Sequence, residues 1–385
     1  MNESKAKRPV RVLGAAVAVS LLLTWPLLSG SAPKDSPGGD SYKVGMAFRS
    51  FAPKEPYDWR GSQAHTLDVV VWYPTQADAP EKPLVIHGLD IFELGSAARD
   101  APLAAQPARL PLVVISHGTG GSGLSMAWLG EALAAHGYIA AAVNHPGNNA
   151  AEPYTAKGFS IWWERARDLS ETISGMLADA KFGDRIDPRR IGSAGFSLGG
   201  YTMIAIAGGI TDLQGFVRFC DSPDAGKNCA SPPEFPSLVE DFRKLMREQP
   251  EALRHSGDSF RDARVRAVFA MAPGLGPAFT ASSLETISIP VQIVAGESDQ
   301  NVPIDLNAKY FAAKIPGAKL HIFPGNVAHY VFLDSCSAIG RKTLPVLCVD
   351  AQGVNRDAIH ADTVRRALQF FGVKLEPESS RLPER

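Results

Sequence analysis

The residue with the clearest chemical potential is Ser197, which stands between glycines in the pentapeptide Gly-Phe-Ser-Leu-Gly at 195–199. The run at 190–194 predicts a short buried strand, and the small, apolar run at 199–208 predicts a buried helix. Flanking glycines permit a sharp strand-to-helix turn that presents a serine hydroxyl as a nucleophile. The same pentapeptide also occurs as an ordinary tight turn, so the partners of the serine must decide between the two.

A serine hydroxyl attacks only when a base takes its proton, and the usual base is a histidine oriented by a carboxylate. After a strand–serine–helix turn of this kind, the acid and then the histidine follow along the chain. The histidines downstream of the serine are His255, His321, His329 and His360. Only His329 lies in a loop just after a predicted strand, because the others belong to a polar insertion, a strand and a helix. The sequence therefore predicts His329 as the base.

The acid should lie on the loop after the preceding strand, which is predicted at 289–295. Asp299 occupies that loop, and Pro303 argues against a helix directly before it. Glu297 is a nearby rival, while Asp334 follows the histidine and so has the wrong order along the chain. We predict Asp299 as the acid.

Attack at a carbonyl also requires donors for the negative oxygen that forms. One predicted donor is the backbone N–H of Leu198, the residue after the nucleophile. The other should come from the Ser-His-Gly-Thr-Gly-Gly loop at 116–121, where we predict the N–H of Thr119. His117 is interpreted as a residue that braces this loop.

The same loop contains a G-x-G-x-x-G pattern at Gly118, Gly120 and Gly123, which is the fingerprint of dinucleotide binding. That fingerprint also needs an acidic residue near the end of the next strand, where this chain has Asn-His-Pro at 144–146. A phosphate-binding loop would need lysine where Leu124 stands. A nucleotide cofactor is therefore not expected, and no metal-ligand set or other cofactor signal is visible.

The N-terminus has the features of an export signal. Basic residues within 1–11 precede an apolar run at 12–28 and small residues at 29–32. The prediction is a signal peptide at 1–31 or an uncleaved anchor formed by 12–28, followed by a flexible linker at 32–41. We expect a periplasmic or secreted protein whose only membrane contact is this leader, if it is uncleaved.

The cysteines agree with export, because structural disulfides need an oxidising compartment. The chain has four cysteines, and the pairing that closes the shortest loops joins Cys220 to Cys229 and Cys336 to Cys348. Free thiols are the alternative.

Composition limits the class of protein further. The 385 residues are 45% hydrophobic and 21% charged, as in a folded globular protein, with a net charge of −1. A chain without net positive charge or a basic block beyond its first residues is not expected to bind nucleic acid.

The remaining pattern predicts an α/β fold. Two strands at 42–75 should pair antiparallel, and 76–107 should form loop. From residue 111 strands alternate with helices, which indicates a mostly parallel sheet covered by helices on both faces. The predicted strands are 112–116, 138–143, 190–194, 263–272, 289–295 and 319–323, and the predicted helices include 124–136, 161–180 and 357–371.

The predicted domain covers 42–375, and 376–385 should be a flexible tail. Between the serine helix and the strand at 263–272, residues 213–262 exceed the length of a simple crossover. This insertion includes an amphipathic helix at 238–246 and is expected to be either a lid over the site or a structural decoration.

With these residues in place, the chain resembles the α/β-hydrolase superfamily over about residues 42–372. Within it, the chain looks like exported serine hydrolases described as predicted dienelactone hydrolases, which are related to platelet-activating factor acetylhydrolases and bacterial polyester hydrolases. The resemblance rests on the segments Val-Trp-Tyr-Pro at 71–74, His-Gly at 117–118, Asn-His-Pro-Gly at 144–147, Gly-Phe-Ser-Leu-Gly-Gly at 195–200 and His-Tyr-Val-Phe at 329–332.

Two departures from these families matter. Dienelactone hydrolases proper use a cysteine nucleophile where this chain has Ser197, so dienelactone itself is not the expected substrate. Animal platelet-activating factor hydrolases take the acid from a loop soon after the nucleophile, but here the corresponding segment, Met-Ala-Pro-Gly at 271–274, has no carboxylate. The acid therefore remains Asp299.

The sequence thus predicts a cofactor-independent hydrolase of small or lipid-like carboxylic esters that forms an acyl-enzyme on Ser197. Three alternatives stay open: an amidase or peptidase with the same residues, a polyester hydrolase, and a non-catalytic envelope binding protein on a hydrolase scaffold.

Overall fold

A computed structural model describes residues 41–53, 56–76, 78–84, 91–232 and 235–376. The predicted leader at 1–31, nearly all of the linker at 32–41 and nearly all of the tail at 376–385 lie outside these residues. Among the helices that the structure describes, none is both long and apolar enough to span a membrane.

The described chain is organised around a ten-stranded sheet in the order β10-β9-β8-β7-β5-β6-β2-β1-β4-β3. The six strands from β10 to β6 are parallel, and β2 and β1 extend this sheet in antiparallel fashion. The strands are β1 (Lys43–Phe51), β2 (Leu67–Thr75), β3 (Lys82–Pro83), β4 (Ser96–Arg99), β5 (Leu110–Ser116), β6 (Ile139–Val143), β7 (Ile186–Phe196), β8 (Val265–Met271), β9 (Val291–Gly296) and β10 (Lys319–Phe323). The predicted mostly parallel sheet with antiparallel N-terminal strands is confirmed.

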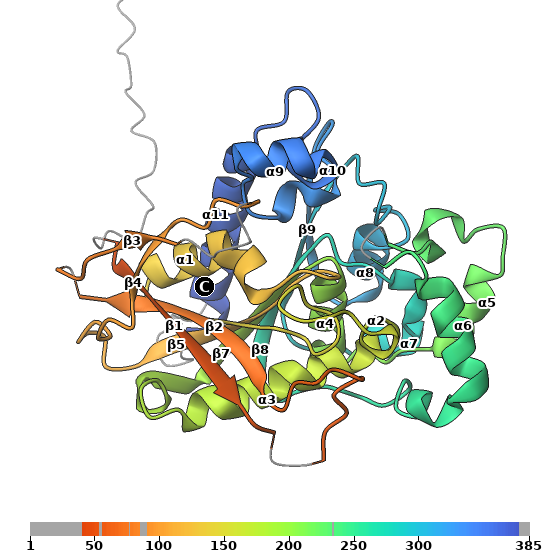
Figure 1. Cartoon of the computed structure of the whole chain (residues 1–385), viewed down its shortest axis with the longest axis horizontal. Helices are drawn as coiled ribbons and strands as arrows, with labels where there is room; N and C mark the ends of the chain where they lie inside the picture. The colour runs from red at the N-terminus through yellow and green to blue at the C-terminus, as the bar shows by residue number, and fades with distance from the viewer. Residues whose placement is uncertain (1–40, 54–55, 77, 85–90, 233–234, 377–385) are drawn as a thin grey trace, which may run out of the picture. The chain divides into compact units, whose positions relative to one another are not determined.

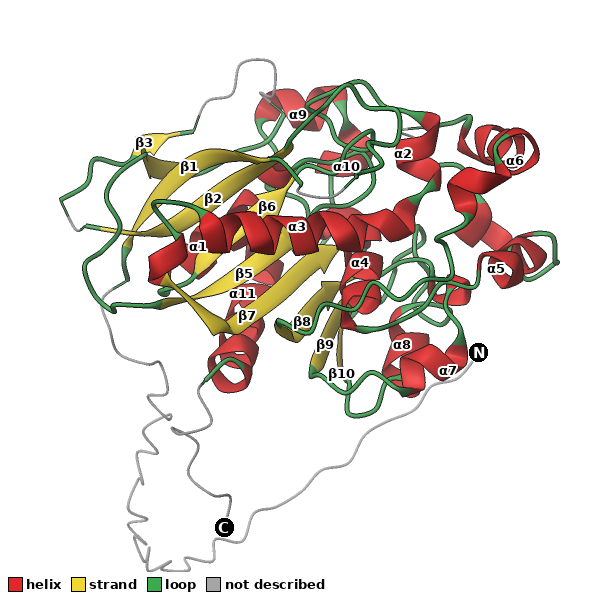
Figure 2. Cartoon of the chain, turned by 90° about the horizontal axis from the view of Figure 1, so that it is seen from below, coloured by secondary structure: helices red, strands yellow, loops and turns green. Residues whose placement is uncertain are grey.

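Helices cover both faces of the sheet (Figure 1; Figure 2). One core layer packs α3 (Arg165–Ala178), α4 (Leu198–Ala207), α7 (Ala281–Glu285) and α8 (Ala308–Lys314) on the sheet. The opposite layer packs α1 (Ala127–Ala135) and α11 (Arg356–Lys374). Neighbouring strand residues alternate between the layers, as Val70 and Val71 of β2 do, because side chains along a strand point to opposite faces.

Two local predictions were wrong. The segment 76–107 contains the short strands β3 and β4, and β4 pairs with β1 through only two residue pairs, too few to leave a sequence pattern. The strand predicted at 190–194 is too short, because β7 begins at Ile186 and includes Asp187 and Pro188. The proline is tolerated because the pairing of β7 with β5 is irregular there, between Leu110 and Leu112.

The segment 213–262 contains α5 (Leu213–Cys220) and α6 (Leu238–Glu248), with short 3₁₀ turns after each. Both helices lie at the side of the domain opposite β3 in both views (Figure 1; Figure 2). Helix α6 also packs against α2 (Ala156–Ser160), which follows β6. The insertion therefore has its own helices and rests on the domain.

Two carboxyl groups make the stability of this fold dependent on pH: the partly buried Glu131 in α1, and the buried Asp334, which contacts the start of that helix. Burial, together with the charge of Asp334, raises the pKa of Glu131 to about 8. Burial raises the pKa of Asp334 to about 7, although its carboxylate accepts the N–H of Trp128 at 3.0 Å. The folded protein thus holds protons that the unfolded chain loses above about pH 4, so stability falls as pH rises from about 4 toward 8.

We expect Glu131→Gln to flatten this decline. At about pH 8 the variant should melt roughly 3 °C or more above the unsubstituted protein, while near pH 4 the two should melt together. Thermal unfolding followed by circular dichroism across this pH range is the measurement. A melting difference that is the same at both ends of the range would contradict the assignment.

Candidate active site

Ser197 lies at the sharp turn between β7 and α4. Its backbone has φ 56° and ψ −116°, a region that residues other than glycine rarely adopt. The flanking glycines are required by close contacts, because a Cβ on Gly195 would lie 2.4 Å from the Gly199 carbonyl oxygen and a Cβ on Gly199 would lie 2.0 Å from the Ser116 carbonyl oxygen. The turn carries the serine at the carboxyl end of the sheet.

The structure joins Ser197, His329 and Asp299 in one chain of hydrogen bonds. His329 Nε2 lies 2.9 Å from Ser197 Oγ, and His329 Nδ1 lies 2.6 Å from Asp299 Oδ2. The carboxylate at Nδ1 favours the tautomer that carries the proton there, which leaves Nε2 free to accept the serine proton. His329 and Asp299 are 4% and 3% exposed, so this polar pair is shielded from bulk water.

Asp299 is oriented by the backbone of its own loop. Its Oδ1 accepts the N–H groups of Asn301 at 2.9 Å and Val302 at 2.8 Å, which directs Oδ2 toward His329. The rival Glu297 is exposed and accepts the N–H of Gly325 at 2.6 Å, so the structure does not bring it to the imidazole.

His329 begins a short 3₁₀ turn, His329–Phe332, that is held from two helices. The indole of Trp128 in α1 donates to the Phe332 carbonyl at 3.1 Å, and His360 Nε2 in α11 lies 2.8 Å from the Val331 carbonyl. The Trp128 and His360 rings stack, with centroids 4.0 Å apart. These two residues carried no sequence signal for this role, because their contacts join segments far apart along the chain.

The two predicted oxyanion donors border the same cavity as Ser197 and His329. Leu198 is the first residue of α4, where backbone N–H groups have no partner within the helix and favour a negative charge nearby. In the described part of the chain, no acceptor pairs with the Thr119 N–H. A Cβ on Gly118 would lie 3.3 Å from Ser197 Cβ, so this loop runs directly beside the serine.

A cavity of about 870 Å³ opens at these residues. Its walls are mainly apolar, and two groups of side chains form much of them. The 213–262 insertion contributes Phe216, Val217, Leu238, Val239, Phe242 and Met246. A second group, from other parts of the chain, consists of Phe92, Leu94, Leu333, Leu344, Val346 and Leu347. A long or bulky apolar group therefore fits beside the serine.

Each wall carries one of the two predicted disulfides, and both pairings are present. Cys220 pairs with Cys229 in the insertion, and both residues line the cavity. Cys336 pairs with Cys348, which clips together the short helices α9 (Ala338–Thr343) and α10 (Pro345–Cys348). Each covalent link closes a short loop within its own wall.

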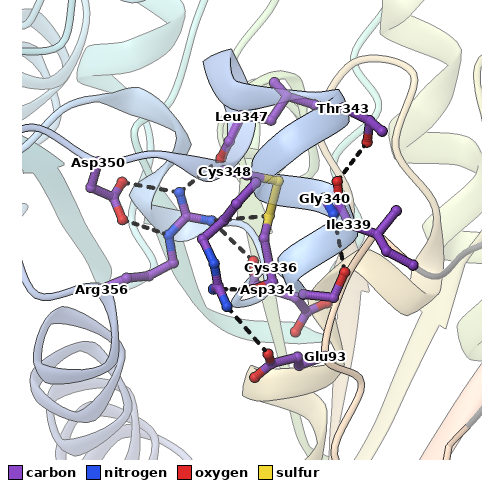
Figure 3. The surroundings of a disulfide bond; sticks show 12 residues. Glu93, Asp334, Cys336, Ile339, Gly340, Thr343, Leu347, Cys348, Asp350 and Arg356 are labelled. Carbon is purple, nitrogen blue, oxygen red and sulfur yellow. Dashed lines mark hydrogen bonds and ion pairs between the residues drawn. A yellow bond between two sulfur atoms is a disulfide. The ribbon is translucent and has the colours of Figure 1, made fainter.

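Figure 3 shows how the second wall is anchored. The buried guanidinium of Arg356 binds both carboxylate oxygens of Asp350, at 2.9 and 3.0 Å, and donates to the backbone carbonyls of Leu347 and Asp334. Arg341 donates to the Cys336 carbonyl and pairs with Glu93 at 3.9 Å. Arg356 and Arg341 thus hold the segment 334–350 of this wall in place.

The glycine pattern at 118–123 has a packing explanation. Gly120 has φ 62°, and a Cβ on Gly123 would lie 2.7 Å from the Ala142 carbonyl oxygen. Among the described residues, no group of three or more acidic, histidine or cysteine side chains could hold a metal ion.

Parts of this chain are similar in sequence to known proteins. The family model for platelet-activating factor acetylhydrolase, isoform II, matches residues 92–161. Cutinases est1 and est2 of Thermobifida alba are each 33% identical over 104 residues, or 26% of this chain. The match covers 32% and 31% of those proteins, so the chain spans about a third of the length of these curated relatives.

The fold comparison covers far more of the chain. The structure of a ferulic acid esterase from Streptomyces cinnamoneus matches 89% of this chain and 94% of that protein, with a TM-score of 0.58 and 21% identity. The sheet order, the serine turn and this match agree with the predicted architecture. The chain therefore shares the fold of this esterase, and shorter segments of it are similar in sequence to the cutinases and to the platelet-activating factor acetylhydrolase family.

Proposed function

We propose that this protein is a serine-dependent hydrolase of carboxylic esters. The observation that carries the proposal is the hydrogen-bonded chain from Ser197 Oγ through His329 to Asp299, which opens onto an apolar cavity of about 870 Å³. The proteins that the chain resembles, a cutinase, a ferulic acid esterase and a platelet-activating factor acetylhydrolase family, are ester hydrolases by name, which supports the same reaction class.

In the proposed reaction, Ser197 Oγ attacks the ester carbonyl carbon while His329 Nε2 takes the serine proton. Asp299 holds the ring and stabilises the imidazolium that forms. The N–H groups of Thr119 and Leu198 bind the oxyanion of the tetrahedral intermediate. The intermediate collapses as His329 protonates the departing alcohol, which leaves an acyl group on the serine. Water then attacks this acyl-enzyme with His329 as base, and the acid and the free serine are released.

The apolar cavity supports esters with an apolar acyl or alcohol group as substrates. Each methylene group that moves from water into such a cavity contributes about 0.8 kcal/mol. Two groups of apolar side chains line the cavity, so both halves of the ester can gain from burial. This supports a lipid-like substrate.

We further propose that the protein is exported, as the basic and apolar N-terminal sequence suggests. All four cysteines are paired, and such pairs persist in oxidising compartments such as the periplasm or the extracellular medium.

The nucleophile is tested by Ser197→Ala. We expect turnover of p-nitrophenyl butyrate to fall to background, because no other activated hydroxyl borders the cavity in the described chain, while the thermal melt stays nearly unchanged. A fluorophosphonate probe should label the unsubstituted protein and leave the variant unlabelled. Retained turnover in the variant would rule out Ser197 as the nucleophile.

Variants of two carboxylates on one loop test which of them orients His329. Asp299→Asn should lower kcat by roughly 10⁴, since the amide cannot hold the ring in its productive tautomer. The matched variant Glu297→Gln should keep kcat within about twofold, because its carboxylate faces Gly325. The reverse ranking of the two variants would transfer the role to Glu297.

The substrate class is tested with p-nitrophenyl esters from acetate to decanoate. We expect kcat/KM to rise with acyl length by up to about fourfold per methylene group until the cavity is filled. Phe242→Ala should reduce this gain for long esters and leave acetate turnover unaffected. Val373→Ala, which removes an exposed apolar side chain of α11, serves as the control. A flat length profile would contradict an apolar substrate.

A further inference from the structure

A second serine–histidine–aspartate chain lies in the interior. Ser116 Oγ is 2.8 Å from His145 Nε2, and His145 Nδ1 is 2.6 Å from Asp168 Oδ2. These distances match those of the set at Ser197, which borders the cavity, but Ser116, His145 and Asp168 are all 0% exposed. Substrate cannot reach Ser116, so these three hydrogen-bonded residues must have a role other than nucleophilic attack.

Asp168, the acid of this interior set, is held by several hydrogen bonds. Arg60, itself 1% exposed, donates to both oxygens of Asp168 at 2.7 and 3.0 Å, and the Tyr57 hydroxyl donates to the same carboxylate. Burial and the nearby charges of Arg165 and Arg60 lower the pKa of His145 well below its usual range. His145 is therefore neutral, with its proton on Nδ1 toward Asp168, and its Nε2 accepts the Ser116 hydroxyl.

Arg165 connects this interior set of residues to the loop that carries Thr119. It is the first residue of α3, and its guanidinium is 1% exposed. It donates to the His117 carbonyl, to Ser116 Oγ at 3.3 Å and to Asn148 Oδ1 at 3.4 Å. One buried cation thus binds the end of β5 and the loop after β6.

The backbone on both sides of Thr119 is held by the same group of residues. His117 Nδ1 lies 2.6 Å from the Gly118 carbonyl, and His117 Nε2 accepts the N–H of His145 at 3.2 Å. Asn148 Oδ1 accepts the N–H of Gly120 at 2.8 Å. Burial and the charge of Arg165 lower the pKa of His117, so this ring is also neutral and donates through Nδ1.

The planarity of the peptide bond between Gly118 and Thr119 determines where the Thr119 N–H points. The Gly118 carbonyl and the Thr119 N–H belong to one planar trans peptide unit, so they point in opposite directions. Holding the carbonyl oxygen against His117 therefore directs the N–H away from the interior, on the side where Thr119 borders the cavity.

We propose that Arg165 and Asn148 are positioning residues for the oxyanion hole, acting through the loop at 117–120 to aim the Thr119 N–H at the reacting carbonyl. The inference rests on the proposed ester hydrolysis, since it assigns these interior residues a part in stabilising its transition state. The two serine–histidine–aspartate sets then have different roles. The set at Ser197 reacts with substrate, and the set at Ser116 supports the loop at 117–120.

The test compares Arg165→Met and Asn148→Ala with the matched control Tyr57→Phe. All three remove a buried polar group from the network, but the Tyr57 hydroxyl contacts only the far side of Asp168. Active sites are titrated to completion with a fluorophosphonate, and kcat and KM for p-nitrophenyl acetate are measured per titrated serine. Normalising in this way removes the effect of any unfolded fraction.

We expect both test variants to lose roughly 10- to 100-fold in kcat per site, because an oxyanion donor is misplaced, with KM changed by less than about threefold. Tyr57→Phe should melt at a lower temperature yet keep kcat per site within about twofold. If Arg165→Met does not fold, Asn148→Ala alone decides, since it removes the contact to Gly120. Unchanged kcat per site in the folded variants would overturn the proposal, whereas failure of the unsubstituted protein to react with the probe would overturn the proposed function itself.

Discussion

The 2.9 Å contact between Ser197 Oγ and His329 Nε2 joins two positions that lie 132 residues apart, and most of the carboxyl half of the chain is arranged around it. One partner stands on a turn that only glycine neighbours permit. The other stands on a short 3₁₀ turn held by Trp128 and His360 from two helices of the same sheet face. Because the parallel strands β7 to β10 all end at one edge, their following loops meet there, and this is how distant residues become neighbours.

The interior set at Ser116 shows that hydrogen-bond geometry alone does not identify a catalytic group. Two sets with nearly equal distances occur within one domain, and they differ in access and in what surrounds them. The set at Ser197 borders a cavity of about 870 Å³, while the interior set is fully buried beside the cations of Arg60 and Arg165. The side-chain polar atoms of Ser116, His145 and Asp168 are all hydrogen-bonded, and a buried polar network that is satisfied in this way is rigid enough to support a loop.

Much of this arrangement could be predicted from the sequence because its signals are local or follow chain order. Glycines around Ser197, buried apolar runs and the order serine, acid, histidine were enough to indicate the fold, and they also singled out the three residues that the structure brings together. Arg165 could not be assigned in this way, because an arginine on an amphipathic helix normally faces water. Its burial depends on acceptors supplied by β5 and by the loop after β6, and no pattern near residue 165 records them.

The central claim is that an acyl group is transferred to Ser197 during turnover, and trapping that intermediate tests it most directly. The protein is mixed with p-nitrophenyl butyrate, quenched in acid within the first turnover, digested and analysed by mass spectrometry. The account predicts one butyryl group on the peptide that contains Ser197, formed in step with a burst of p-nitrophenol. Butyrylation of a different residue, with the Ser197 peptide unmodified, would contradict it.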